Sequence, residues 1–159
     1  MAIEIARVDD HFERYDELLN VIISAFAYME GVIDPPSSAA RLTAQILREK
    51  SGSEMAYMAL EGVHIVGCIF LRPEPPDTLY VGKLAVLPSI QGKGVGIRLM
   101  RLAEEIAHRT GFHALRLEVR VELTRNQNYF ADSGFVRTAE NRHPGFDRTT
   151  SFEMRKVLS

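Results

Sequence analysis

The stretch Leu84–Gly96, LAVLPSIQGKGVG, decides the fold of this 159-residue chain. It begins inside an apolar run, residues 78–87, that is typical of a β-strand. Pro88 ends that strand, because proline has no N–H to donate to a ladder. Three glycines follow at alternate positions, and apolar side chains then recur at helical spacing up to residue 110. The stretch therefore predicts a strand, a glycine-rich turn and a helix in direct succession.

The glycine turn itself predicts an anion-binding site. Glycine adopts positive φ and lets a ligand come close to the backbone. At a helix N-terminus the free N–H groups point outward, and the helix dipole favours negative charge. Together these properties predict a cradle for a phosphate or pyrophosphate. The plainer alternative is a tight turn that holds no ligand.

Two common phosphate-binding motifs do not fit this turn. A P-loop reads GxxxxGK[ST], but Gly92-Lys93 lacks both the earlier glycine and the following Ser or Thr. A dinucleotide-binding turn reads GxGxxG, whereas Ile97 stands here in place of the third glycine. The turn is also preceded by a hairpin instead of opening the first strand–helix–strand unit. An enzyme of nucleotide phosphates is therefore the weaker hypothesis.

Outward from this stretch, the sequence predicts a mixed sheet with helices on its faces. The unit over residues 78–121 implies two parallel strands joined by a crossover helix, while the hairpin before it is antiparallel. Asp9 and Asp10 are candidate caps of the first helix, and Ser37 or Ser38 of the second. The expected strands are 2–8, 54–60, 63–71, 78–87, 114–121, 135–139 and 149–157; the expected helices are 10–28, about 38–51, about 96–110 and 124–132; residues 72–77 are expected to be a loop.

Composition excludes several classes of protein. The chain has 19 basic and 21 acidic residues, so it lacks the basic excess of most nucleic-acid binders. It has neither an apolar run of about 18 residues nor a signal peptide, so we expect no membrane partner and a cytoplasmic location. The only cysteine, Cys68, lies in an apolar run and is expected to be a buried small hydrophobe. The histidines are scattered without ligand spacing, and no metal is expected.

Residues 84–96 resemble the acyl-CoA-binding motif of the GNAT N-acetyltransferase superfamily. That motif, Gln/Arg-x-x-Gly-x-Gly/Ala, reads here as Gln91-x-x-Gly94-x-Gly96. Residues 126–135 are similar to the family's Asn-x-x-x-Tyr-x-x-x-Gly-Phe segment. The order of elements also matches: a strand, two helices, three strands, a helix, a strand, a helix and two strands. The resemblance implies one α/β (α+β) domain over residues 1–159, with a mixed, mostly antiparallel sheet whose parallel pair splays apart.

The same resemblance implies an acetyl-CoA-dependent N-acetyltransferase that transfers its acetyl group directly to a small-molecule or peptide amine in a ternary complex. The backbone N–H of Val86 is expected to stabilise the oxyanion. The family often dimerises, so a homodimer is expected. The expected acetyl-CoA contacts are Leu84, Ala85, Val86, Gln91, Gly92, Lys93, Gly94, Val95, Gly96, Asn126 and Phe130.

One position departs from the family. The usual proton donor is a tyrosine four residues before the glycine of Gly-Phe, and this chain has Phe130 there. Tyr129 is adjacent, but one helical residue turns a side chain by about 100°. A thiol pKa near 8.5 allows the thiolate to leave unprotonated. Three interpretations stay open: unassisted departure, Tyr129 as the donor, and a CoA-binding module without catalysis.

The acceptor side is less readable. An alkylamine has a pKa near 10, so a base must remove a proton before it attacks. Glu118 is the candidate base or anchor; an exposed salt-bridging side chain is its plainer interpretation. The region between the first two helices, with Tyr28 and Arg41, shapes the acceptor pocket in the family. The acceptor-binding candidates are Tyr28, Tyr80, Lys83 and His143.

Overall fold

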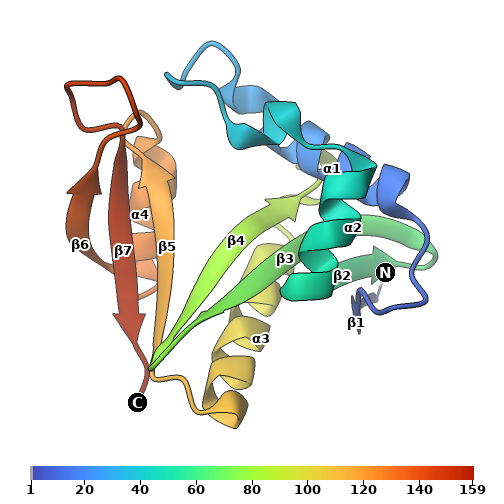
Figure 1. Cartoon of the computed structure of the whole chain (residues 1–159). Coiled ribbons are helices and arrows are strands. Elements are labelled where there is room, and N and C mark those ends of the chain that lie inside the picture. The colour runs from blue at the N-terminus through green and yellow to red at the C-terminus, as the bar shows by residue number, and fades with distance from the viewer. Residues whose placement is uncertain (1) are drawn as a thin grey trace.

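The structure, a computed structural model, describes residues 2–159, which form a seven-stranded sheet with helices on both faces (Figure 1). The strands lie in the order β1-β2-β3-β4-β5-β7-β6. β4 and β5 are parallel, and the other neighbouring pairs are antiparallel. The expected mixed fold is confirmed. The strands are β1 (Ile3–Arg7), β2 (Met55–Glu61), β3 (His64–Glu74), β4 (Thr78–Val86), β5 (Ala114–Arg120), β6 (Val136–Asn141) and β7 (Ser151–Val157).

Four α-helices and three short 3-10 helices connect these strands in the described part of the chain. None of the helices between residues 2 and 159 is both long and apolar enough to cross a membrane. The α-helices are α1 (Tyr15–Phe26), α2 (Ala44–Ser53), α3 (Val95–Thr110) and α4 (Thr124–Asp132), and the 3-10 helices are η1 (Ala27–Met29), η2 (Ser38–Arg41) and η3 (Pro88–Ile90).

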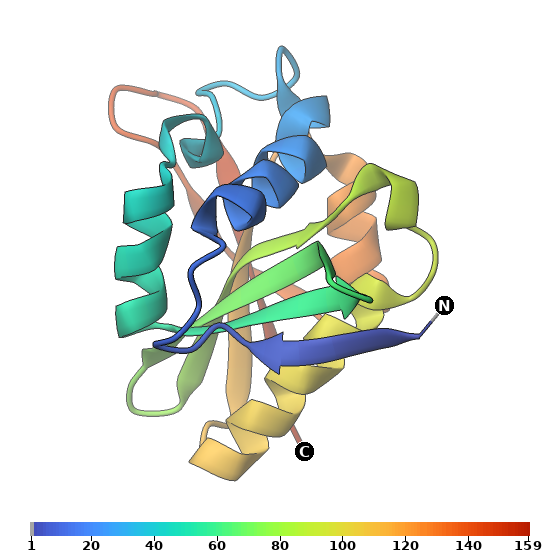
Figure 2. The same ribbon diagram turned by 90° about the vertical axis from the view of Figure 1, so that its right-hand side faces the viewer.

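β3 shows why both faces of the sheet are covered. All seven residues from Ile65 to Leu71 are buried. Successive strand residues point to opposite faces, so this run needs a partner on each. Cys68 and Phe70 belong to the core under α1 and α2, and Ile69 and Leu71 to the core under α3. Figure 2 shows α1 and α3 crossing opposite faces of the sheet.

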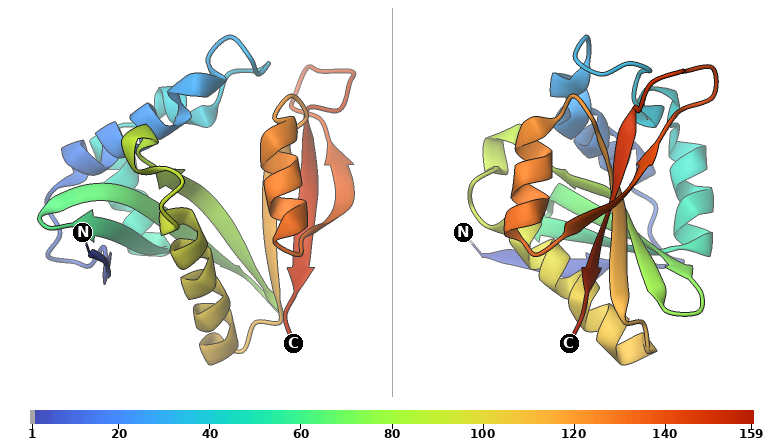
Figure 3. Two further views of the ribbon diagram at one scale, coloured as in Figure 1. Left: turned by 180° about the vertical axis from the view of Figure 1, so that it is seen from behind. Right: turned by 90° about the vertical axis from the view of Figure 1, so that its left-hand side faces the viewer.

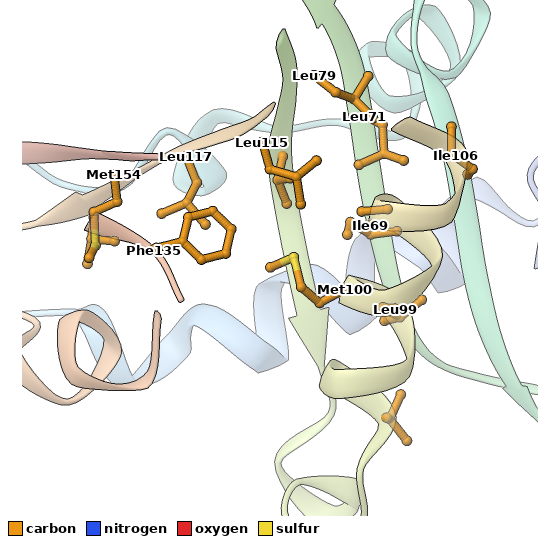
Figure 4. Packing of buried hydrophobic residues seen from close by; sticks show 14 of the residues in the cluster. Ile69, Leu71, Leu79, Leu99, Met100, Ile106, Leu115, Leu117, Phe135 and Met154 are labelled. Carbon is orange, nitrogen blue, oxygen red and sulfur yellow. The ribbon is translucent and has the colours of Figure 1, made fainter. Parts of the chain in front are cut away.

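The core under α3 fixes that helix against β4 and β5. Leu99, Met100 and Ile106 are buried and point from α3 toward side chains of the sheet, among them Leu79 and Leu115 (Figure 4). Truncating a fully buried leucine such as Leu99 to alanine typically costs about 3 kcal/mol of folding free energy. This packing holds the N-terminus of α3 beside the end of β4.

The first two helices start later than predicted. α1 begins at Tyr15, not at residue 10, because Asp9 caps a local turn: its side chain accepts from the N–H of His11 at 2.9 Å. Phe12 is still buried, packing edge-on against Tyr15 from that turn. The segment expected as one helix from residue 38 is divided into η2 and α2. Ser37 caps η2, and the Thr43 hydroxyl caps α2.

β3 also runs further than predicted, through Pro73 to Glu74. Pro73 lies opposite Leu79 of β4. On the other side, pairing with β2 ends at Leu71, opposite Met55. Pro73 is therefore in a part of β3 with only one neighbouring strand, where a missing N–H is tolerated.

Candidate active site

The site begins where β4 and β5 separate. Their parallel pairing covers only Thr78–Tyr80 with Ala114–Arg116, although β4 continues to Val86 and β5 to Arg120. Beyond the last pair the strands diverge into a V (Figure 1). Seen from behind, α3 and α4 lie on either side of that opening (Figure 3). The parallel pair therefore splays apart, as the family resemblance implied.

A β-bulge redirects the end of β4. Cys68 lies opposite Ala85, but Phe70 lies opposite Gly82, so two residues of β4 oppose one of β3. Lys83, at the bulge, has a φ of 48°. After the bulge the Leu87 N–H donates to β3. Because successive N–H groups of a strand point to opposite sides, the N–H of Val86 faces away from β3, toward the opening.

The glycine turn has the conformation that its sequence predicted. Gly92 and Gly94 have φ of 82° and 83°, and Gly94 is the N-cap of α3. No side chain caps this helix, and no atom lies within 4 Å of where a Cβ on either glycine would stand. The Gln91 side chain donates to the Val86 carbonyl at 3.1 Å, tying the turn to β4. The first N–H groups of α3 are thus accessible to an anion.

Two of the predicted acetyl-CoA contacts have side chains that point elsewhere. Ala85 and Val95 are 2% exposed and belong to the core. Only their backbone atoms can reach a ligand. Lys93 is exposed, and Leu84 and Val86 are partly buried and pack against the core under α3.

Tyr129, and not Phe130, faces the glycine turn. A Cβ on Gly96 would lie 3.8 Å from the Tyr129 hydroxyl and 3.9 Å from Cγ2 of Val86. Three elements, α4, α3 and β4, therefore meet at this hydroxyl, and partial burial raises the pKa of Tyr129. The ring of Phe130 packs edge-on against Phe135 in the core. The predicted contact of Phe130 with acetyl-CoA stays a prediction.

Asn126 and Tyr28 bond to each other. The Asn126 amide on α4 donates to the Tyr28 hydroxyl on η1 at 2.9 Å. The two residues were predicted for different ligands, yet their side chains form one bridge between the two arms of the V. The Tyr28 side chain is otherwise largely exposed.

On the face opposite α3, the V opens into a pocket of about 790 Å³. Tyr80, Glu118 and His143 line it as predicted, whereas Tyr28 and Lys83 do not. Lys83 reaches the pocket wall indirectly, because its Nζ donates to the Ser38 hydroxyl at 3.0 Å. The remaining lining residues are Pro35, Pro36, Ser37, Ser38, Ala40, Arg41, Arg120, Pro144, Phe146 and Ser151.

Tyr80 is held rigidly on the floor of this pocket. The guanidinium groups of Arg72 and Arg116 each lie 4.5 Å from the centre of its ring. Glu74 binds both arginines, with two 2.8 Å bonds from Arg116 and one of 3.3 Å from Arg72. Burial and the nearby Glu118 carboxylate raise the pKa of Tyr80, so its hydroxyl stays protonated at neutral pH.

Glu118 lies two residues beyond the last β4–β5 pair, on the same polar face as Arg116 and Arg120. Its Oε1 is 3.4 Å from Arg116 and 3.3 Å from the Asn141 amide. Its Oε2 makes no hydrogen bond within residues 2–159. One carboxylate oxygen thus stays available on the pocket floor.

Residues 34–36 form the roof of the pocket, and they accept hydrogen bonds from β5 and from the β6–β7 loop. Arg120 donates to the carbonyls of Pro35 and Pro36 at 2.7 and 3.1 Å. Arg148 donates to the Asp34 carbonyl at 2.9 Å. Figure 1 shows the two loops meeting above the V. Burial and Arg120 lower the pKa of His143, whose ring Nδ1 bonds to the Thr150 hydroxyl, so the imidazole is neutral at pH 7.

Sequence reasoning did not identify several residues that line this pocket. Ser37 caps η2 and Ser38 begins it, while Phe146 comes from the β6–β7 loop and Ser151 from the start of β7. Arg120 lies two residues from Glu118 in β5, so strand alternation puts both side chains on one face. No periodic signal marks the η2 residues, because they lie in irregular chain between two helices.

In this chain the sheet splits between two parallel strands, and a glycine turn begins the helix that follows the first of them. Residues 16–135 match the model of the acetyltransferase (GNAT) family. The chain therefore belongs to the GNAT family of acetyltransferases. No curated protein matches the chain in sequence.

Solved structures share the fold at low sequence identity. The PaiA N-acetyltransferase of Thermoplasma acidophilum, in complex with coenzyme A, superposes with a TM-score of 0.75 at 21% identity over 99% of this chain and 100% of that one. A GNAT family acetyltransferase from Elizabethkingia anophelis with acetyl-CoA bound gives 0.69 at 18% identity over 98% of each chain. The ribosomal-protein-S18-alanine N-acetyltransferase of Escherichia coli gives 0.70 at 16% identity over 99% of this chain and 95% of that one.

Proposed function

We propose that this chain transfers an acetyl group from acetyl-CoA directly to an amine held in the pocket. The observation that carries the proposal is the short pairing of β4 with β5, beyond which the strands separate, with the glycine turn following β4 and Tyr80 and Glu118 lining the pocket. Two structural neighbours hold acetyl-CoA or coenzyme A. Both substrates can therefore meet in one complex at the V.

On the cofactor side, the backbone N–H groups of residues 91–96 receive the pyrophosphate. Gly92 and Gly94 leave open space there, since no atom lies within 4 Å of a Cβ on either. The pantetheine arm runs along the free edge of β4 at residues 84–86. Asn126 contributes a hydrogen bond to this arm if its amide exchanges Tyr28 for the ligand.

The residues at the V divide the chemistry among them. The acceptor amine loses a proton to Glu118, directly or through water, and its nitrogen attacks the thioester carbonyl carbon. The N–H of Val86 stabilises the negative charge that develops on the carbonyl oxygen. When the carbon–sulfur bond breaks, the Tyr129 hydroxyl gives its proton to the departing sulfur. The nitrogen still carries one proton more than the amide product, and it loses this proton, through solvent, to the Tyr129 phenolate, which restores the hydroxyl. The raised pKa of Tyr129 keeps that hydroxyl protonated beforehand.

Binding is the first test. In calorimetric titrations, acetyl-CoA should bind saturably and ATP should not. Release of free thiol from acetyl-CoA in the presence of an amine panel then measures transfer. If the protein binds acetyl-CoA but none of the amines in the panel causes release of free thiol, it is the non-catalytic CoA-binding module.

Tyr129→Phe tests the proton donor. We expect kcat to fall about a hundredfold, since general acid catalysis contributes roughly 10² to 10⁴. The dissociation constant of acetyl-CoA should change by less than about twofold, because phenylalanine keeps the aromatic ring beside the glycine turn. Tyr57→Phe on β2 is the matched control. An unchanged kcat in Tyr129→Phe would mean that the thiolate leaves unprotonated.

The homodimer and the cytoplasmic location stay predictions. β6 is an edge strand, and Val136 on it is 65% exposed, which supports pairing with a second copy. Light scattering on the purified chain tests it, and a single species at the mass of one chain would exclude the dimer.

A further inference from the structure

The charges in the pocket are unbalanced. Arg41 and Arg120 line it, and neither has a carboxylate within 4 Å among residues 2–159. Glu118 is the one acidic residue of the lining, and it is shared with Arg116. His143 adds no negative charge. Before any substrate binds, the lining therefore carries an excess of positive charge.

The excess is concentrated at η2. Arg41 is exposed and makes no hydrogen bond or ion pair within the described residues. Arg120, in contrast, already donates two hydrogen bonds to the carbonyls of Pro35 and Pro36. The planar fork of Arg41 is thus free to bind a carboxylate or phosphate through two parallel bonds.

The two serines beside Arg41 are also poised as donors. The Ser37 hydroxyl oxygen already accepts from the Ala39 N–H at 3.1 Å. The Ser38 hydroxyl oxygen accepts from Lys83 Nζ at 3.0 Å. A hydroxyl whose oxygen is occupied in this way still has its own proton to donate. Ser37, Ser38 and Arg41 therefore offer donors, and no acidic acceptor, at one end of the pocket.

The phosphates of CoA do not account for these groups. η2 lies with α1 and α2 on one side of the sheet, whereas α3 and its glycine turn lie on the other (Figure 3). A simple amine does not account for them either. It arrives mostly as a cation, and Arg41 and Arg120 repel it.

We propose that the acetyl acceptor of this chain carries a carboxylate in addition to its amine. The inference rests on the proposed function. The anionic group binds to Arg41 and the hydroxyls of Ser37 and Ser38. The amine points toward Glu118 and Tyr80 on the floor, where the strands separate. The substrate class is that of amino acids and similar amino-carboxylates.

Product-like probes test this inference by binding. The panel consists of N-acetyl amino acids, each paired with its carboxamide and with the N-acetyl amine that lacks the carboxyl carbon, titrated into the protein saturated with CoA. At least one acid should bind about tenfold or more tightly than its carboxamide, because hydrogen bonds to charged groups exceed neutral ones by that margin. Arg41→Gln should abolish this preference, and Arg41→Lys should restore part of it.

Arg142→Gln is the matched control. Arg142 is an exposed arginine next to the pocket-lining loop, but it does not line the pocket. If its loss reduced the preference as much as Arg41→Gln does, general charge and not a binding site would be the cause. The proposal is also overturned if carboxamides or amines bind as well as the acids, or if no acid binds. The CoA titration in the same samples tests the proposed function separately.

Discussion

Gly94 and Gly111 cap the two ends of α3, and replacing each with valine separates ligand binding from folding. Both residues have nearly the same backbone conformation, with φ of 83° and 84°. No atom lies within 4 Å of a Cβ on either one. Gly94 lies in the proposed phosphate cradle, whereas Gly111 ends the helix 17 positions later, at the far end from the V. The two substitutions therefore carry the same conformational penalty at different distances from the ligand.

The penalty follows from the left-handed conformation. An L-residue with a Cβ pays roughly 1–2 kcal/mol there, and a β-branched one is at the upper end. For a chain of this length, about 2 kcal/mol lowers the melting temperature by roughly 4–8 °C. Both variants should show this loss in thermal unfolding and remain folded at 25 °C, because native domains are stable by about 5–15 kcal/mol.

Binding should distinguish the two variants. If Gly94→Val turns one N–H away from the pyrophosphate, the lost hydrogen bond to a charged group costs about 1.5–3 kcal/mol, which is roughly 10- to 100-fold in the dissociation constant. Gly111→Val should bind CoA as the parent chain does. Calorimetric titration with CoA measures both. Equal affinities in the two variants would refute the anion cradle at the start of α3.

Three further predictions concern folding and reactivity. Gly67→Ala should lower the unfolding free energy, measured by chemical denaturation, by at least about 2 kcal/mol, because the new Cβ would lie 2.9 Å from the Ala85 carbonyl oxygen. Gly52→Ala is the control: its Cβ would meet open space in α2, so the change should be neutral or stabilising by up to about 1 kcal/mol. Glu74→Gln should lower the unfolding free energy at pH 7 by about 1–2 kcal/mol. The hydrogen bond from Arg116 lowers the pKa of Glu74 below its usual 4.5, so the ion pair stabilises the fold fully above pH 4.5. As the pH falls through the lowered pKa, the melting temperatures of the parent chain and of Glu74→Gln should therefore converge. The Cys68 thiol, fully buried with its pKa raised to about 12 by burial, should react with a thiol reagent only after unfolding; reaction in the native state would contradict its packing in the core.

The choice between Tyr129 and Phe130 shows where helical sequence reasoning stops. The sequence places both residues on one helix, about 100° apart, but their shared pattern does not say which side faces the cofactor. That orientation depends on how α4 packs. Phe130 fits against Phe135 from the following segment, and this contact turns Tyr129 toward the glycine turn. The same limit applies at residues 9–14, where Phe12 matched the helical period but is buried from a turn.

By itself the sequence determined the order of the main helices and strands, the family and the conformation of the glycine turn. Each of these is written in neighbouring residues: the period of apolar side chains, the glycines that need positive φ, and the helix that follows them. The positive φ of Gly92 and Gly94 could be predicted, because a single short segment forms the N-terminus of a helix.

Only the tertiary structure decided the pocket lined by Tyr80, Glu118 and Arg41. Its walls come from η2, β4, β5 and the β6–β7 segment, and β7 lies between β5 and β6 in the sheet, against the order of the chain. The Asn126–Tyr28 bridge joins residues 98 positions apart. Such contacts depend on how the sheet and helices pack as a whole, and no local spacing encodes them. The surplus of cationic groups around Arg41 therefore became visible only once the distant segments were brought together.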